Sequence, residues 1–138
     1  MKLPALLLLA CLTGCMSRVD AALERAQERV YNATGRVAVP TKLYAAPFIL
    51  CKDERERYVG CTDIDTGRVW VATRFSDDDL EHTLVHELFH LLGMRGHVMA
   101  GHGIMGESRS ASLRMITAAD LAEACAQFHC NWRRPETE

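Results

Sequence analysis

The sequence predicts an α+β fold, and three observations support this prediction. Apolar residues recur at helical spacing in residues 18–32, between Ser76 and Gly93, and in residues 117–128. Between the first two helical segments, residues 35–75 contain short β-prone runs separated by turn-like or charged pieces. Helices that flank a block of strands, rather than alternate with single strands, are typical of the α+β class. The length of 138 residues fits a single domain.

The N-terminal stretch, MKLPALLLLACLTGC, differs from the rest of the chain. A lysine, an apolar run and small residues before Cys15 are typical of a secretory signal, and the run is too short to span a bilayer. The ending LTGC resembles the lipobox of bacterial lipoproteins. This resemblance implies that residues 1–14 are removed, that Cys15 carries lipid, and that residues 15–138 form the mature domain. Met16, where an aspartate would favour the inner membrane, resembles the outer-membrane case, so we expect an envelope protein anchored there and facing the periplasm.

Four cysteines remain outside this stretch and Cys11: Cys51, Cys61, Cys125 and Cys130. An exported protein meets an oxidising compartment, so an even number of cysteines indicates two disulfides. Of the three possible pairings, the local one, Cys51–Cys61 with Cys125–Cys130, requires the least reorganisation of the chain. A structural zinc on four thiolates is disfavoured because close CxxC pairs are absent.

The first helix is predicted from one apolar face, and Gly35 is its expected end. The apolar residues of this face lie at steps of four, three and four: Val19, Leu23, Ala26 and Val30.

Four β-prone runs follow, at residues 36–40, 47–51, 57–61 and 68–75. The sequence DIDTG between the last two predicts a hairpin turn. In the last run Val69 and Val71 alternate with more polar residues, so one face of this strand is expected to be apolar.

The second helix is predicted to begin after Ser76, which can cap it, with Asp79 at the spacing of a capping box. Gly93 is a suitable residue to end it. Residues 95–113 are rich in Gly, Ser and Arg and predict an irregular loop. A final helix over residues 117–128 would be capped by Thr117.

Candidate metal ligands lie on the second helix. His86 and His90 are one helical turn apart, so they share a face and could bind one zinc ion. Glu87 follows the first histidine directly, where it cannot easily join them as a ligand. It can reach a metal-bound water instead, which is the position of a general base.

The residues HELFHLLG resemble the metzincin zinc metalloproteases, whose pattern is HExxHxxGxxH followed by a methionine-containing turn. The chain departs from this pattern because Gly96 stands where the third ligand is expected. His97 follows one residue later, which we interpret as a one-residue insertion. Met105 follows His97 by eight residues, a spacing similar to that of matrixins, whereas the competing ligand His102 lies only three residues before Met105.

The resemblance covers about residues 68–128, and the small size is also similar to that of snapalysin-like enzymes. It implies a metzincin-like domain: a twisted, mostly antiparallel or mixed sheet between an N-terminal helix and the active-site helix, then a Met-turn and a C-terminal helix. It implies one catalytic Zn²⁺ on His86, His90 and His97, with Glu87 as general base of an endopeptidase that cleaves protein or peptide substrates. Met105 would form an apolar floor, and the strand at residues 68–74 would be an edge strand lining the cleft.

Two alternatives remain open. A non-catalytic, zinc-bearing envelope lipoprotein that serves as a binding or assembly module would explain the displaced third histidine. A gluzincin-like site would take Asp120 or Glu123 as the third ligand. His82 and His129 are expected to lie outside the metal site. The net charge of −2 and the lack of a basic cluster argue against a nucleic-acid partner.

Overall fold

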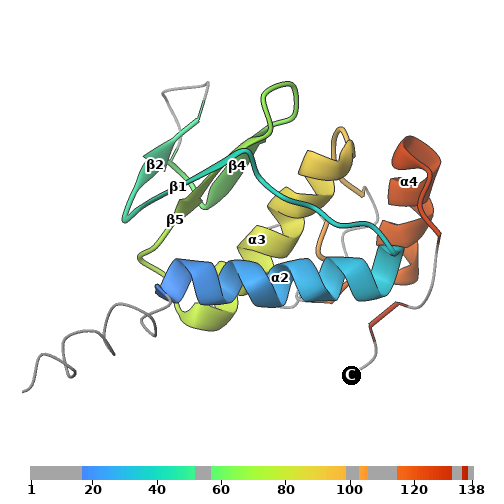
Figure 1. The fold of residues 1–138 in the computed structure, drawn as a ribbon, viewed down its shortest axis with the longest axis horizontal. Helices are drawn as coiled ribbons and strands as arrows, with labels where there is room; N and C mark the ends of the chain where they lie inside the picture. The colour runs from blue at the N-terminus through green and yellow to red at the C-terminus, as the bar shows by residue number, and fades with distance from the viewer. Residues whose placement is uncertain (1–16, 52–56, 99–102, 106–114, 132–134, 137–138) are drawn as a thin grey trace, which may run out of the picture.

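The computed structural model describes residues 17–51, 57–98, 103–105, 115–131 and 135–136 (Figure 1). The leader, the lipidation candidate Cys15 and the competing ligand His102 therefore lie outside the described residues. The elements, in chain order, are α2 (Arg18–Thr34), β1 (Lys42–Ala46), β2 (Ile49–Leu50), β3 (Arg57–Tyr58), β4 (Gly60–Asp63), β5 (Arg68–Ala72), α3 (Asp77–Leu92) and α4 (Ala118–Phe128). This order confirms the predicted α+β class.

The principal sheet is mixed and has the strand order β1-β5-β4. β1 pairs with β5 in parallel, whereas β4 pairs with β5 in the antiparallel direction. The turn between β4 and β5 is the predicted DIDTG hairpin, and Gly67 adopts a φ of 72° there. A second, antiparallel pair of strands, β2 and β3, completes the β part of the described chain.

Two expectations about the strands are wrong. Residues 36–40 form no strand, and the first strand comes later, as β1. Pro40 has no backbone N–H to donate, so pairing begins at Thr41, whose N–H donates to the carbonyl of Gly67 over 2.8 Å. The strand at residues 68–74, which was expected at an edge, is β5, and it is the central strand of the principal sheet, with β4 at one edge.

The helix ends follow the predicted capping residues. Gly35 ends α2 with a φ of 72°, and the Ser76 side chain accepts a hydrogen bond from the Asp79 N–H at the start of α3. Thr117 and Asp120 form a reciprocal capping box at the start of α4. These side chains bond the backbone groups that a helix end leaves unpaired. The helix ends could therefore be predicted from neighbouring residues in the sequence.

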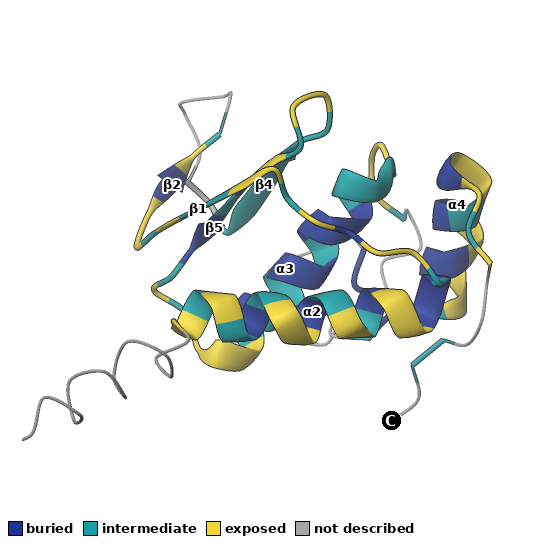
Figure 2. Ribbon diagram, in the orientation of Figure 1, coloured by how far each residue is buried: buried dark blue, intermediate teal, exposed yellow. Residues whose placement is uncertain are grey.

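The core lies between the principal sheet and the helices, and α3 passes through its centre (Figure 2). Val69 and Val71 of β5 are fully buried, as the alternation in the sequence predicted. Leu84, Leu88 and Phe89 of α3 are also fully buried. Most faces of α3 are therefore covered by protein, and its position in the domain is fixed by packing.

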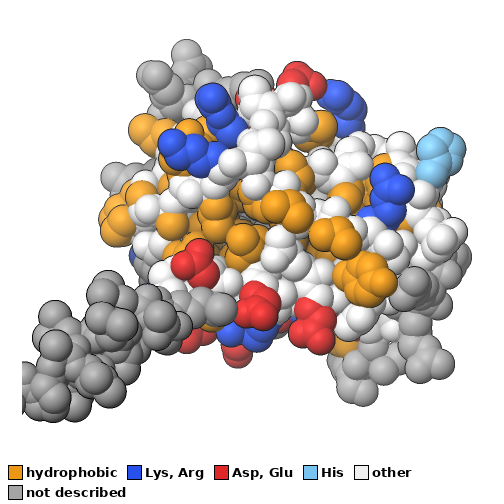
Figure 3. All heavy atoms as spheres, viewed as in Figure 1, with side chains coloured by type: hydrophobic (Ala, Val, Ile, Leu, Met, Phe, Trp, Pro, Cys, Tyr) orange, Lys and Arg blue, Asp and Glu red, His pale blue; other side chains and the backbone are white. Residues whose placement is uncertain are grey.

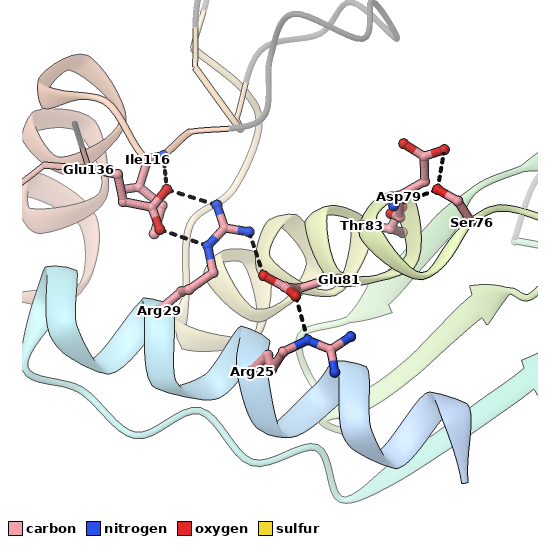
Figure 4. A network of polar contacts seen from close by, with 8 residues as sticks. All are labelled: Arg25, Arg29, Ser76, Asp79, Glu81, Thr83, Ile116 and Glu136. Atoms are coloured by element: carbon pink, nitrogen blue, oxygen red, sulfur yellow. Dashed lines mark hydrogen bonds and ion pairs between the residues drawn. The ribbon is translucent and has the colours of Figure 1, made fainter. Parts of the chain in front are cut away.

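A polar network also fixes α3 against α2 and the C-terminal segment (Figure 4). Arg29 of α2 donates to both carboxylate oxygens of Glu136, at 2.7 and 2.8 Å, and to Glu81 of α3 at 3.1 Å. Arg25 donates to the other oxygen of Glu81 at 2.7 Å. Bidentate pairs of this kind have a defined geometry, so the network orients the two helices.

Both predicted disulfides, Cys51–Cys61 and Cys125–Cys130, are present. The first ties the end of the β2 segment to β4, and the second closes the end of α4. Each closes a short loop and stabilises the fold mainly by restricting the unfolded chain.

Candidate metal centre

Three histidines from α3 and the segment after it converge on one point. His86 and His90 project from the same side of α3, and their Nε2 atoms lie 3.1 Å apart. The chain then reverses through Gly93 and Gly96, with φ values of 120° and 90° that side-chain-bearing residues rarely adopt. This reversal brings His97 Nε2 to 3.1 Å from His86 Nε2.

Hydrogen bonds determine which ring nitrogens carry protons. His86 Nδ1 lies 2.7 Å from the carbonyl oxygen of Ile104, and His90 Nδ1 lies 2.7 Å from that of Met94. A carbonyl can only accept, so each Nδ1 carries the proton and donates it. The Nε2 atoms of His86 and His90 are therefore left with lone pairs that face one another.

This arrangement fits a metal ion better than it fits an imidazole cluster alone. The three ligand atoms all lie within 4.8 Å of one another. Two nitrogens on one tetrahedral zinc, each about 2.0–2.1 Å from it, would be about 3.3 Å apart. The observed 3.1 Å separations are close to that value, and facing lone pairs at this distance repel unless a cation lies between them.

Burial keeps the two helical imidazoles neutral. Desolvation, reinforced by the neighbouring His90 and His97, lowers the pKa of His86 to about 3. Desolvation also lowers the pKa of His90. His97, by contrast, is exposed, so the group opens to solvent at the chain reversal. Neutral imidazoles with an open side are the form in which histidines bind a catalytic metal.

The Glu87 carboxylate lies against β4 and does not belong to the histidine group. The side chain is buried, and its Oε2 accepts a hydrogen bond of 2.7 Å from the Thr62 hydroxyl. Its Oε1 lies beside Gly60, where an added Cβ would come within 2.8 Å of it. Desolvation raises the pKa of Glu87 to about 7, against the opposing effect of the Thr62 hydrogen bond. The carboxylate is thus held by two residues of one edge strand.

Met105 lies in a turn held by Asp120. The Met105 side chain is fully buried, and its carbonyl accepts from the Val98 N–H over 2.8 Å. The Asp120 carboxylate accepts from the N–H groups of Ile104 and Met105 at 3.0 and 3.2 Å. Because the Ile104 carbonyl in turn accepts from His86, Asp120 fixes the backbone that orients a candidate ligand.

The two acidic residues of the gluzincin-like alternative are engaged elsewhere. Asp120 is buried and bonds the turn and its own helix cap, and Glu123 is exposed and accepts from Gln127 at 2.9 Å. Among the described residues, the only group placed to share a metal ion is His86, His90 and His97. His82 and His129 lie outside this group, as expected.

Sequence reasoning missed Gly60 and Thr62 as parts of the site, and considered Asp120 only as a ligand. Gly60 and Thr62 lie on a strand distant in sequence from α3, and no local spacing relates them to Glu87. The one available signal was the Thr117–Asp120 spacing, which predicts a helix cap but not the bonds to Ile104 and Met105.

If Glu87 serves as a general base, Thr62→Val should lower kcat by about ten- to a hundredfold, because a hydrogen bond to a charged group contributes roughly 1.5–3 kcal/mol. The hydroxyl is the group that fixes the Glu87 carboxylate in place. Thr62→Ser keeps the hydroxyl and should restore most of the rate. Steady-state kinetics and thermal melting of both variants test this, because equal losses in the two variants would indicate a merely structural role.

The chain matches no protein-family model, no curated protein and no solved structure. The structure therefore shows an α+β domain with a three-histidine group that could hold a metal ion.

Proposed function

We propose that this three-histidine group binds one catalytic zinc ion and that the protein is a metzincin-type endopeptidase attached to the cell envelope by lipid. The observation that supports the proposal most is the convergence of three imidazole nitrogens, two of them with assigned lone pairs, beside a buried glutamate. Three histidine ligands leave one coordination position for water, as in catalytic rather than structural zinc sites.

When bound, zinc would lower the pKa of a coordinated water and polarise the scissile carbonyl of a peptide. Glu87 would accept the proton of that water and transfer it to the leaving amine. The Glu87 carboxylate is buried against β4, and its hydrogen bond from the Thr62 hydroxyl limits its rotation. It would therefore lose little conformational entropy when it accepts the proton. The Ile104 and Met94 carbonyls hold the His86 and His90 rings in the tautomer that ligates.

The test is zinc content together with peptide cleavage. We expect elemental analysis of the purified protein to give about one zinc per chain. A mixed peptide library should be cleaved, cleavage should stop with a zinc chelator, and it should return when zinc is restored. Zinc-free protein with full cleavage would refute the proposed site, and zinc-loaded protein without cleavage would refute the enzyme.

The zinc-loaded but inactive outcome defines the second candidate function, a zinc-bearing binding or assembly module. One observation favours it: in this structure the Glu87 carboxylate bonds Thr62 and contacts Gly60, rather than joining the histidine group. A general base has to reach a water on the metal. The two candidates therefore differ in whether the zinc-loaded protein cleaves peptides.

Lipid attachment at Cys15 is the proposed anchor. In the described part of the chain, no helix is both long enough and apolar enough to cross a bilayer. A lipidated N-terminal cysteine with several acyl chains would attach the domain firmly, whereas one chain would not. The LTGC ending and Met16 support attachment to the outer membrane with the domain in the periplasm.

Cys15→Ser is expected to move the protein from the membrane fraction to the soluble fraction, or to leave the leader uncleaved, because no thiol remains to accept lipid. Cys11→Ser, four residues earlier in the same stretch, is the matched control and should behave as wild type. Fractionation and intact-mass measurement check the result. A Cys15→Ser protein with unchanged mass increment and location would exclude lipidation at this residue.

A further inference from the structure

We infer that the end of the domain formed by Phe48, Leu50 and Arg74 rests on the surface of the bilayer to which the chain is anchored. We call these three residues the membrane-facing end. The inference rests on the lipid anchor at Cys15 proposed above, but it does not depend on the zinc site or on catalysis.

The anchor enters the domain beside this end. Cys15 precedes Ser17, the N-cap of α2, by two residues, which span at most about 7 Å. The next residue, Arg18, donates to the carbonyl oxygen of Thr73 at 2.8 Å and to that of Phe75. These two carbonyls flank Arg74, so the start of α2 is fixed next to the membrane-facing end.

The exposed side chains at this end suit a lipid interface. Phe48 is 56% exposed and Leu50 is 60% exposed, although both are apolar. The Arg74 guanidinium lies 4.8 Å from the centre of the Phe48 ring and 4.3 Å from that of Phe75. Arginine stacked on aromatic rings presents an apolar body and a charged tip, which is the combination found where membrane meets water. In Figure 3, hydrophobic side chains lie at the surface on the side where Figure 1 shows the link between β1 and β2.

The local charge is balanced rather than basic. Arg18 pairs with Asp77, and Asp78 is exposed beside them on the first turn of α3. Attraction to anionic headgroups is therefore not the basis of the contact. The basis of the contact is the burial of Phe48 and Leu50 in the bilayer surface, so a zwitterionic bilayer should be enough for binding.

The opposite end of α2 provides an internal comparison. Val37 and Val39 follow α2 and are 69% and 64% exposed, so they are as apolar and as accessible as the membrane-facing end. They follow the C-terminal end of α2, whereas the anchor precedes its N-terminal end, and the Ala38 carbonyl between the two valines accepts from the Gln27 side chain at 2.8 Å, about halfway along the helix. With the bilayer in contact with Phe48, we expect these valines to remain in water.

This orientation also places the histidine group relative to the bilayer. α3 begins at Asp77, beside the anchor, and His86 and His90 follow about 14 and 20 Å further along its axis. The histidine group therefore lies toward the end of α3 that is distant from the bilayer.

The experiment places an added tryptophan either at the membrane-facing end or in the segment that follows α2. The lipidated protein is reconstituted in phosphatidylcholine vesicles with or without brominated acyl chains, as Phe48→Trp and as Val37→Trp, and each is compared with the parent chain. The tryptophan at position 48 should lose about half of its added emission to the bromine, because interfacial side chains sit roughly 5–10 Å into the headgroup boundary. The tryptophan at position 37 should lose none.

Equal quenching at both positions, or none at position 48, would overturn the inference. A concentration-dependent blue shift at position 48 in detergent without a bilayer would also overturn it, since the surface would then contact a second copy of the chain. Intact mass verifies the lipid in each sample, and unlipidated protein would remove the premise. Zinc content, measured on the same samples, reports separately on the proposed function.

Discussion

Glu87→Gln should keep the bound zinc and lower kcat by about 10²–10⁴-fold, the range contributed by a positioned general base. Glutamine has nearly the same shape, so it can still accept a hydrogen bond from the Thr62 hydroxyl. It cannot accept a proton from water. The metal should remain because Glu87 does not belong to the group of converging ligand atoms.

The measurements are zinc stoichiometry, steady-state peptide hydrolysis and thermal melting. Asp78→Asn is the matched control, since it also converts an acid to its amide on α3, but at an exposed position. It should retain wild-type zinc content and turnover. Wild-type turnover in Glu87→Gln would refute Glu87 as the general base, whereas zinc-loaded wild-type protein without turnover would leave the zinc-bearing module as the better account.

His97→Ala should lower zinc affinity by more than the 10–100-fold that loss of an outer-shell partner costs. It removes one of three ligands, and activity should disappear with the metal. His102→Ala should bind zinc nearly as the wild type does, because the other candidate third ligand already lies 3.1 Å from His86. Competition with a chelating dye gives the affinities.

His82→Ala is the control that tests whether the loss of any histidine from α3 lowers zinc affinity. His82 is half-buried on the same helix but lies outside the converging group, so the zinc affinity of this variant should match that of the wild type. If His102→Ala loses zinc while His97→Ala retains it, the third ligand is His102, and the chain reversal at Gly96 serves another purpose.

The sequence by itself determined the features that depend on neighbouring residues. A spacing of four residues on a helix places His86 and His90 on one side, whatever the rest of the fold does. The caps at Ser76 and Thr117 depend on backbone groups within three residues. The local disulfides also involve only short stretches of chain, and both were predicted.

Only the tertiary structure decided the features that join distant segments. Residues 42–46 form a strand because they pair in parallel with β5. β5 is the central strand because both β1 and β4 pair with it. The contact between Thr62 and Glu87 spans 25 residues. No periodicity in a single segment records such contacts, since they depend on how whole elements pack.

Asp120 shows the same division within one side chain. Within one helical turn, Asp120 completes the cap that Thr117 was predicted to form. Its bonds to the N–H groups of Ile104 and Met105 depend on where the fold places that turn, 15 to 16 residues earlier in the chain. Helix geometry thus determined the positions of the two histidines on α3 and of Glu87 beside them. Packing determined which groups hold them in place, because those groups come from segments that meet only in the folded chain.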